Sequence, residues 1–138
     1  AQNPVSPYGF SKWASGEYLK RFHPNYVNCV FPNVYGVGKK SVVDLFKGET
    51  KVTIYGDGLQ TRDYVHVDDI VRGILLARYW DGGEYMMGSG ISTTVLDLAG
   101  DREIVFKEPR KEARESILDN TTPDWEPIIN VLEYINED

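Results

Sequence analysis

Tyr8 and Lys12 lie four positions apart near the start of this 138-residue chain, and their side chains could carry out proton transfer. Ser6 is a favourable N-cap and Pro7 suits the first helical position, so a helix is predicted to begin here. Residues four apart are neighbours on one helix face. A cation beside a phenol favours the phenolate and lowers the pKa, which helps a tyrosine take a proton from an alcohol near neutral pH. The pair is therefore a candidate general base.

The same pair also has an ordinary structural interpretation. The chain contains nine tyrosines, so a Tyr-x-x-x-Lys match arises easily by chance. An amphipathic helix whose lysine stem lies along apolar surface gives the same pattern. Apolar residues continue at about helical spacing until Pro24 ends the run: Trp13, Ala14, Tyr18, Leu19 and Phe22. The pair alone leaves catalysis and scaffolding both open.

Polar and aromatic side chains that suit a phosphate or a base follow two predicted strand regions. Residues 26–31 are typical of a buried parallel strand, and Asn33 comes directly after it. Ligands of open α/β sheets bind at this end of such strands, although Asn33 also fits an ordinary turn. Strands are predicted at 52–55 and 62–67, with a Gly-Asp-Gly turn between them. The first ends in Tyr55, whose ring face can stack on a base, and the second begins with Arg62, whose guanidinium matches two phosphate oxygens.

The remaining elements are predicted to be scaffold. Loop 36–40 contains glycine and lysine but lacks the strand and spacing of a P-loop, so it is predicted to be a connection. His66 is predicted to support its strand, because the tyrosine–lysine pair already fills the role of base. Asp68 and Asp69 suit a helix N-terminus, and no third ligand at suitable spacing indicates a metal site. Further helices are predicted at 42–47, 67–78, 95–99 and 128–135, and further strands at 85–87 and 104–106.

The composition is that of an ordinary globular domain, with 41% hydrophobic and 26% charged residues. The net charge of -6 argues against nucleic acid and anionic membranes as partners. No apolar run approaches the ~20 residues of a membrane span, and no signal peptide opens the chain. The single Cys29 excludes an internal disulfide and fits a reducing compartment, so a cytoplasmic protein is expected.

Three stretches occur together in a characteristic order: Asn-Pro-Val-Ser-Pro-Tyr-Gly-Phe-Ser-Lys at 3–12, Phe-Pro-Asn-Val-Tyr-Gly at 31–36, and a run at 54–69 that includes Thr-Arg-Asp-Tyr-Val-His. In this order they resemble the extended short-chain dehydrogenase/reductase family, and within it the NAD-dependent nucleotide-sugar epimerases of the UDP-glucose 4-epimerase type. The resemblance runs from Asn3 to about Pro127. It implies an α/β fold, namely the C-terminal part of a Rossmann-type protein with its smaller mixed α/β substrate domain.

The resemblance also implies how the chain is divided. Residues 1–36 correspond to the end of the NAD-binding domain, and residues 37–138 to a nucleotide-sugar-binding domain interleaved with it. The N-terminal NAD half of the family, with its glycine-rich turn, has no counterpart here. The chain is also short for the family around positions 30, 37, 100 and 120. We expect either a natural truncation or a longer protein whose additional residues are absent from this sequence, and the intact mass distinguishes the two.

Site roles follow from the resemblance residue by residue. Tyr8 and Lys12 correspond to the catalytic pair, which also contacts NAD, and the backbone at Phe31 and Pro32 corresponds to the lining of the nicotinamide. Position 110 departs from the family pattern around it, because the family usually has a glycine before the next acid where this chain has Lys111-Glu112 directly. Val43 also fits a plain core position. The implied substrate contacts are Asn33 and Arg62 with the phosphates, Arg110 with the pyrophosphate, Val43 against the base, and Tyr55 stacked on the uracil.

The implied activity is NAD-dependent epimerisation of a UDP-sugar at C4. In the family, the tyrosine removes the proton of the 4-hydroxyl while hydride passes to NAD, and the 4-keto sugar turns over and receives hydride on its other face. Anchoring the pyrophosphate while the sugar rotates makes the inversion possible. The resemblance also implies a homodimer, for which the first helix, Trp13 included, is the predicted surface.

Two alternatives to the epimerase remain open. A nucleotide-sugar 4,6-dehydratase shares Tyr-x-x-x-Lys, but it requires acid and base residues upstream of the tyrosine. Dehydratases more often have a second asparagine at the position of Val34, which favours the epimerase. A non-catalytic nucleotide-sugar-binding fragment is the second alternative, because the NAD half is missing.

Overall fold

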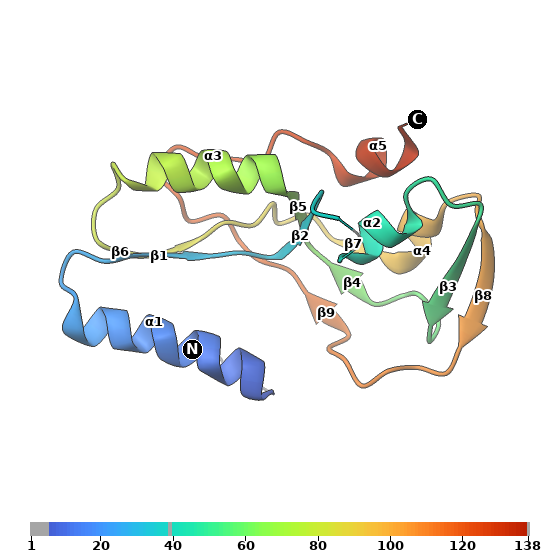
Figure 1. Ribbon diagram of the computed structural model, residues 1–138, viewed down its shortest axis with the longest axis horizontal. Coiled ribbons are helices and arrows are strands. Elements are labelled where there is room, and N and C mark those ends of the chain that lie inside the picture. Colours follow the sequence, from blue (N-terminus) through green and yellow to red (C-terminus); the bar gives the residue numbers. More distant parts are fainter. Residues whose placement is uncertain (1–5, 39, 138) are drawn as a thin grey trace.

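The computed structural model describes residues 6–38 and 40–137 (Figure 1). Within the motifs considered above, Asn3-Pro4-Val5 and Lys39 lie outside the described residues. The helices are α1 Pro7–Phe22, α2 Val42–Phe46, α3 Val67–Ala77, α4 Val95–Ala99 and α5 Val131–Asn136. The strands are β1 Val27–Val30, β2 Asn33–Tyr35, β3 Lys51–Tyr55, β4 Thr61–Arg62, β5 Tyr64–His66, β6 Gly83–Met86, β7 Thr93–Thr94, β8 Glu103–Lys107 and β9 Glu115–Ser116.

Helix starts follow the predicted caps. The Ser6 hydroxyl accepts a hydrogen bond from the backbone N–H of Gly9, at 3.0 Å, and Pro7 occupies the first turn of α1. Ser41 caps α2 in the same way, and Thr94 forms a capping box with Asp97 at the start of α4. These three caps confirm the predicted starts, because each satisfies backbone donors that the first helical turn leaves free.

The strands pair into small sheets, which are mainly parallel. β1 pairs with β6, β2 with β5, and β3 with β8, all in parallel, whereas β4 lies between antiparallel β7 and parallel β9. The parallel pairs join segments that are far apart in the chain, with helices in the connections, as parallel pairing requires. The mixed α/β architecture predicted from the sequence is confirmed.

Two helices cover opposite faces of the β1–β6 pair, with α1 on one side and α3 on the other (Figure 1). Both approach at a glycine. A Cβ atom on Gly16 would lie 2.7 Å from Nδ2 of Asn28 in β1, and one on Gly73 would lie 2.2 Å from Cε of Met87. Since real Cβ contacts are longer, alanine at either position would require the contacted side chain, Asn28 or Met87, to shift. The pairing of β1 with β6 also joins the two segments into which the chain was divided.

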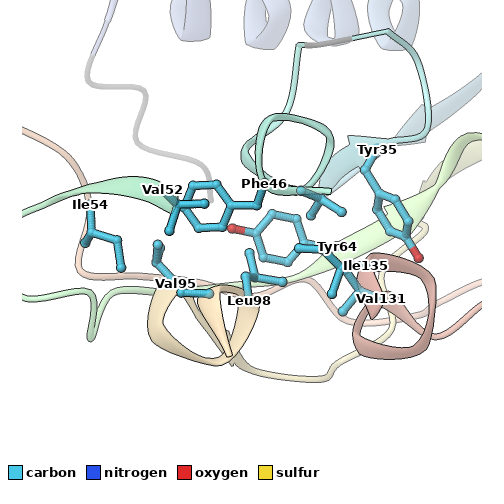
Figure 2. Packing of buried hydrophobic residues seen from close by; sticks show 11 residues of the cluster. Tyr35, Phe46, Val52, Ile54, Tyr64, Val95, Leu98, Val131 and Ile135 are labelled. Carbon is cyan, nitrogen blue, oxygen red and sulfur yellow. The ribbon is translucent and has the colours of Figure 1, made fainter. Parts of the chain in front are cut away.

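The main core lies in the other half of the molecule, between α2, α4, α5 and the strands β3 and β5 (Figure 2). Figure 2 shows Phe46, Tyr64 and Leu98 converging from three elements, and Leu98 is fully buried. A second cluster under α3 contains Val65, Ile70, Met87 and Trp125. The two clusters meet at β5, because Tyr64 faces one of them and Val65 the other. This alternation is what a strand with both faces buried requires.

Two predicted elements differ from those observed, and one alternative is decided. Asn33, for which the sequence left an ordinary turn open, is the first residue of β2, since its N–H donates to the carbonyl of Asp63. The strand predicted at 62–67 is divided at Asp63 into β4 and β5. The C-terminal helix begins at Val131 rather than 128, because Asn130 caps it and the Asp69 carboxylate accepts from the N–H groups of residues 128 and 129.

Candidate functional site

A cavity of about 360 Å³ lies where β2, β3, β4 and the start of α2 meet the segment between β8 and β9. Four of the five predicted substrate residues line it: Asn33, Tyr55, Arg62 and Arg110. They come from β2, β3, β4 and the segment that follows β8. The fold thus brings residues that are up to about 80 positions apart in the chain to one cavity.

Arg62 is held firmly at the cavity wall. Its side chain is 15% exposed, and its guanidinium donates to the carbonyls of Thr61 at 2.7 Å and Ala113 at 2.6 Å. The Nη2 atom also lies 3.5 Å from Oε1 of Glu112. The carbonyl bonds fix the orientation of the guanidinium without neutralising its charge, and the Glu112 carboxylate is the anion that faces this charge.

Arg110 and Tyr55 form a stacked pair in the cavity. The Cζ atom of Arg110 lies 3.5 Å from the centroid of the Tyr55 ring, which is a close cation–π contact. This places the second candidate arginine on the aromatic ring that was predicted to receive the base. One face of the ring is therefore covered by a guanidinium.

Further lining residues were not singled out from the sequence as site residues. Lys40, which follows the glycine loop, adds a third cation to the cavity wall, and Glu112 adds a carboxylate. Gln60 is buried and donates to the carbonyl of Tyr55 at 3.4 Å. Burial raises the pKa of Tyr64 to about 12, so this phenol stays protonated at neutral pH. The lysine-containing loop was the one sequence signal that could have indicated Lys40.

Val43 does not line the cavity. It is fully buried in the main core, on the inner face of α2, and its neighbour Val42 lines the cavity instead. Side chains at consecutive helical positions point about 100° apart, so only one of the two valines can face the hollow. The side chain of Val43 therefore lies in the core, which was the alternative that the sequence left open, and not against a ligand in the cavity.

The Tyr8–Lys12 pair lies outside the cavity, on α1. The ammonium nitrogen of Lys12 is 5.5 Å from the Tyr8 ring centroid, so the two side chains are neighbours as the helical spacing predicts. Tyr8 is 72% exposed, and both side chains face solvent. Phe31 and Pro32 follow directly after β1, and Phe31 is 40% exposed. The described chain therefore carries the candidate proton-transfer pair and the cavity lined by Lys40, Arg62 and Arg110 on different elements.

His66 has a structural role. Its Nδ1 atom accepts from the backbone N–H of Asp68 at 3.0 Å and so caps α3, and the side chain is buried. The ring lies edge-on to Tyr35, with centroids 5.1 Å apart. Among the described residues, no group of three or more His, Cys, Asp or Glu is arranged to hold a metal ion. In the same part of the chain, no helix is both long and apolar enough to cross a membrane.

Comparison with known proteins identifies relatives over most of the chain. The model of the NAD dependent epimerase/dehydratase family matches residues 1–88. UDP-glucose 4-epimerase of Mycolicibacterium smegmatis is 35% identical over 162 aligned residues, which cover 96% of this chain and 51% of that protein. A dTDP-glucose 4,6-dehydratase of Streptomyces griseus is 34% identical and covers 70% of this chain and 33% of its own length.

A solved structure agrees with the sequence relatives. The crystal structure of UDP-glucose 4-epimerase from Thermotoga maritima with UDP-glucose superposes with a TM-score of 0.85 and 37% identity, covering 96% of this chain and 52% of that one. The chain thus spans about half the length of the epimerases it matches. The alignment with the Mycolicibacterium protein is also longer than the chain itself, so that relative has internal residues which this chain lacks.

Proposed function

Because the chain belongs to the NAD dependent epimerase/dehydratase family, we propose that it forms the sugar-binding and proton-transfer part of an NAD-dependent UDP-sugar 4-epimerase. One observation carries the proposal: Asn33, Tyr55, Arg62 and Arg110 line one cavity. Two guanidinium groups suit the pyrophosphate of a nucleotide sugar, and an aromatic ring beside them suits its base. The cavity of about 360 Å³ is of the size that small-molecule sites occupy.

The residues after β1 fit a nicotinamide cofactor. The exposed ring of Phe31 lies at the carboxyl end of a parallel strand, where cofactors of α/β proteins bind. Tyr8 and Lys12 present a hydroxyl and an ammonium group that suit cofactor hydroxyls. When bound, NAD supplies the hydride acceptor of the reaction. We propose that residues 1–36 contribute to the NAD-binding domain and residues 37–138 to the sugar-binding domain.

Tyr8 is the proposed general base. Its phenolate takes the proton of the sugar 4-hydroxyl and becomes the phenol, which later returns that proton to the sugar oxygen, and the Lys12 ammonium stabilises the phenolate form before the proton is taken and after it is returned. Arg62, Arg110 and Asn33 hold the pyrophosphate throughout, so the sugar can turn while the rest of the ligand stays bound. Val42 rather than Val43 offers its side chain to the ligand from α2.

The dehydratase remains the second candidate, because a 4,6-dehydratase is among the relatives. Val34 and the identity to two epimerases over nearly the whole chain favour the epimerase. A homodimer through α1 stays a prediction, supported by the exposed rings of Tyr8, Phe10, Tyr18 and Phe22 on this helix. A cytoplasmic location likewise stays a prediction from the single cysteine.

The product formed from UDP-galactose tests the proposal. Purified protein is incubated with UDP-galactose and NAD, and products are identified by nuclear magnetic resonance. We expect UDP-glucose, and we expect Tyr8→Phe to lower the rate at least about a hundredfold, because the phenol is the base. Tyr18→Phe, on the same helix, is the matched control. A 4-keto-6-deoxy product would identify a dehydratase, and ligand binding without any product would identify a binding fragment.

A further inference from the structure

Arg62 is already engaged by an anion from its own chain. Glu112 provides Oε1 at 3.5 Å from Arg62 Nη2, and both residues line the cavity. Arg110, on the same segment as Glu112, lies on the Tyr55 ring at 3.5 Å. The segment between β8 and β9 thus places a carboxylate against Arg62, where the proposed function puts the pyrophosphate, and a guanidinium over the Tyr55 ring.

The two partners of the ion pair differ in how firmly they are held. Arg62 is fixed by the carbonyls of Thr61 and Ala113 and is 15% exposed at its side chain, whereas the Glu112 side chain is 38% exposed. Among the described residues, the Glu112 carboxylate forms one ion pair, with Arg62, and its charge also contributes to raising the pKa of Tyr64. An incoming anion would therefore displace Glu112 and leave Arg62 in place.

The end of the segment is anchored independently. Arg114 donates two hydrogen bonds to the Asp57 carboxylate, each at 2.9 Å, and so ties the segment to the turn after β3. The anchor lies two residues beyond Glu112, so Glu112 can swing away while the segment stays docked. Arg114 therefore holds the segment in place, and a different residue, Glu112, reaches into the cavity.

We propose that Glu112 is an internal counter-anion, which a nucleoside diphosphate must displace from Arg62, and that it lowers the affinity of the cavity for phosphate-bearing ligands. This inference rests on the proposed function, because it assumes that Arg62 binds the ligand pyrophosphate. Two costs follow from the carboxylate: the loss of its pair with Arg62 and its repulsion of the diphosphate at short range. A ligand that carries no phosphate does not incur either of these two costs.

Calorimetric titration of UDP and of uridine into the purified chain tests the inference. Glu112→Gln keeps the shape of the side chain and removes its charge. We expect this variant to bind UDP about fivefold more tightly than the wild type, while uridine binding changes less than about twofold. Glu108→Gln, on the same segment but outside the cavity lining, is the matched control and should leave both ligands unaffected.

The outcomes are distinguishable from a failure of the proposed function. Equal or weaker UDP binding by Glu112→Gln, with the wild type binding UDP, overturns the role of Glu112 alone. Loss of both UDP and uridine affinity would mean that Glu112 contacts the nucleoside, which also overturns it. If neither protein binds UDP, the cavity is not a diphosphate site, and the proposed function falls together with this inference.

Discussion

Tyr55 combines two tasks in one side chain, because its ring carries the Arg110 guanidinium and faces the cavity. We expect Tyr55→Ala to weaken UDP binding about 5- to 100-fold, since stacking on a base is worth roughly 1–3 kcal/mol. Tyr55→Phe keeps the ring and should retain affinity within about threefold. Calorimetry on the two variants measures the difference. Equal losses for both would mean that the hydroxyl, not the ring face, contacts the ligand.

Asp63 is a fully buried carboxylate that joins β4 to two other segments of the chain. It is fully buried, and its carboxylate accepts from the N–H groups of Ser89, Gly90 and Leu118 and from the Ser89 hydroxyl. We expect Asp63→Asn to lower the free energy of unfolding by about 3 kcal/mol. The asparagine NH2 group would lie against N–H groups that now donate to the carboxylate, so donors would meet a donor instead of an acceptor. Urea titration measures the change, and exposed Asp81→Asn is the control. A change below about 1 kcal/mol would contradict this role.

The segment between β8 and β9 depends on the pair formed by Asp57 and Arg114. The Arg114 hydrogen bonds lower the pKa of Asp57 to about 2, from a usual value of about 4. Because the folded-state pKa is depressed, this contribution is present above about pH 4 and is lost as the pH falls toward 2. We expect Asp57→Asn to speed amide exchange in residues 108–116 at pH 7 while leaving α3 unchanged. Hydrogen exchange with mass spectrometry measures both regions, and unaltered exchange in 108–116 would contradict the anchoring.

The starts of α1, α2 and α4 were predictable from the sequence, whereas the start of α5 and the ends of several strands were not. Ser6, Ser41 and Thr94 act within three residues of themselves, so local chemistry is enough to place α1, α2 and α4. The break between β4 and β5 depends on Asp63 meeting Ser89, 26 residues away. Likewise, α5 begins late because Asp69 accepts from residues 128 and 129. Such long-range hydrogen bonds leave no periodic signal in the sequence.

The candidate site, too, could be predicted only in part from the sequence. The resemblance indicated Arg62 and Arg110 by motif, and the fold brings both to one cavity. Lys40 and Glu112 line that cavity only because β2, β3 and the segment after β8 meet there. The sequence left two positions open for Val43, against the base or in the core. The orientation of the short helix α2 about its own axis decides whether Val43 or Val42 faces the cavity. Family motifs located the chemistry, and packing decided which neighbours join it.

At the scale of the whole molecule, the cavity and the Tyr8–Lys12 pair lie in different parts of the chain. Residues of this chain form the cavity, whereas the Tyr8–Lys12 pair is exposed on α1, which covers one face of the two-stranded β1–β6 sheet (Figure 1). The epimerases that the chain matches are about twice as long as the part of them that it covers. We therefore expect nucleotide-sugar binding to be less dependent on residues beyond this chain than NAD binding is.

Calorimetric titration of UDP-glucose into the purified protein and its Arg62→Met variant tests the central proposal most directly, with folding of both followed by circular dichroism. We expect saturable one-to-one binding by the wild type and at least about tenfold weaker binding by the variant, because one charged anchor of the pyrophosphate is removed. A folded wild type that binds no UDP-glucose, or a variant that binds it equally well, would contradict a nucleotide-sugar site in this cavity.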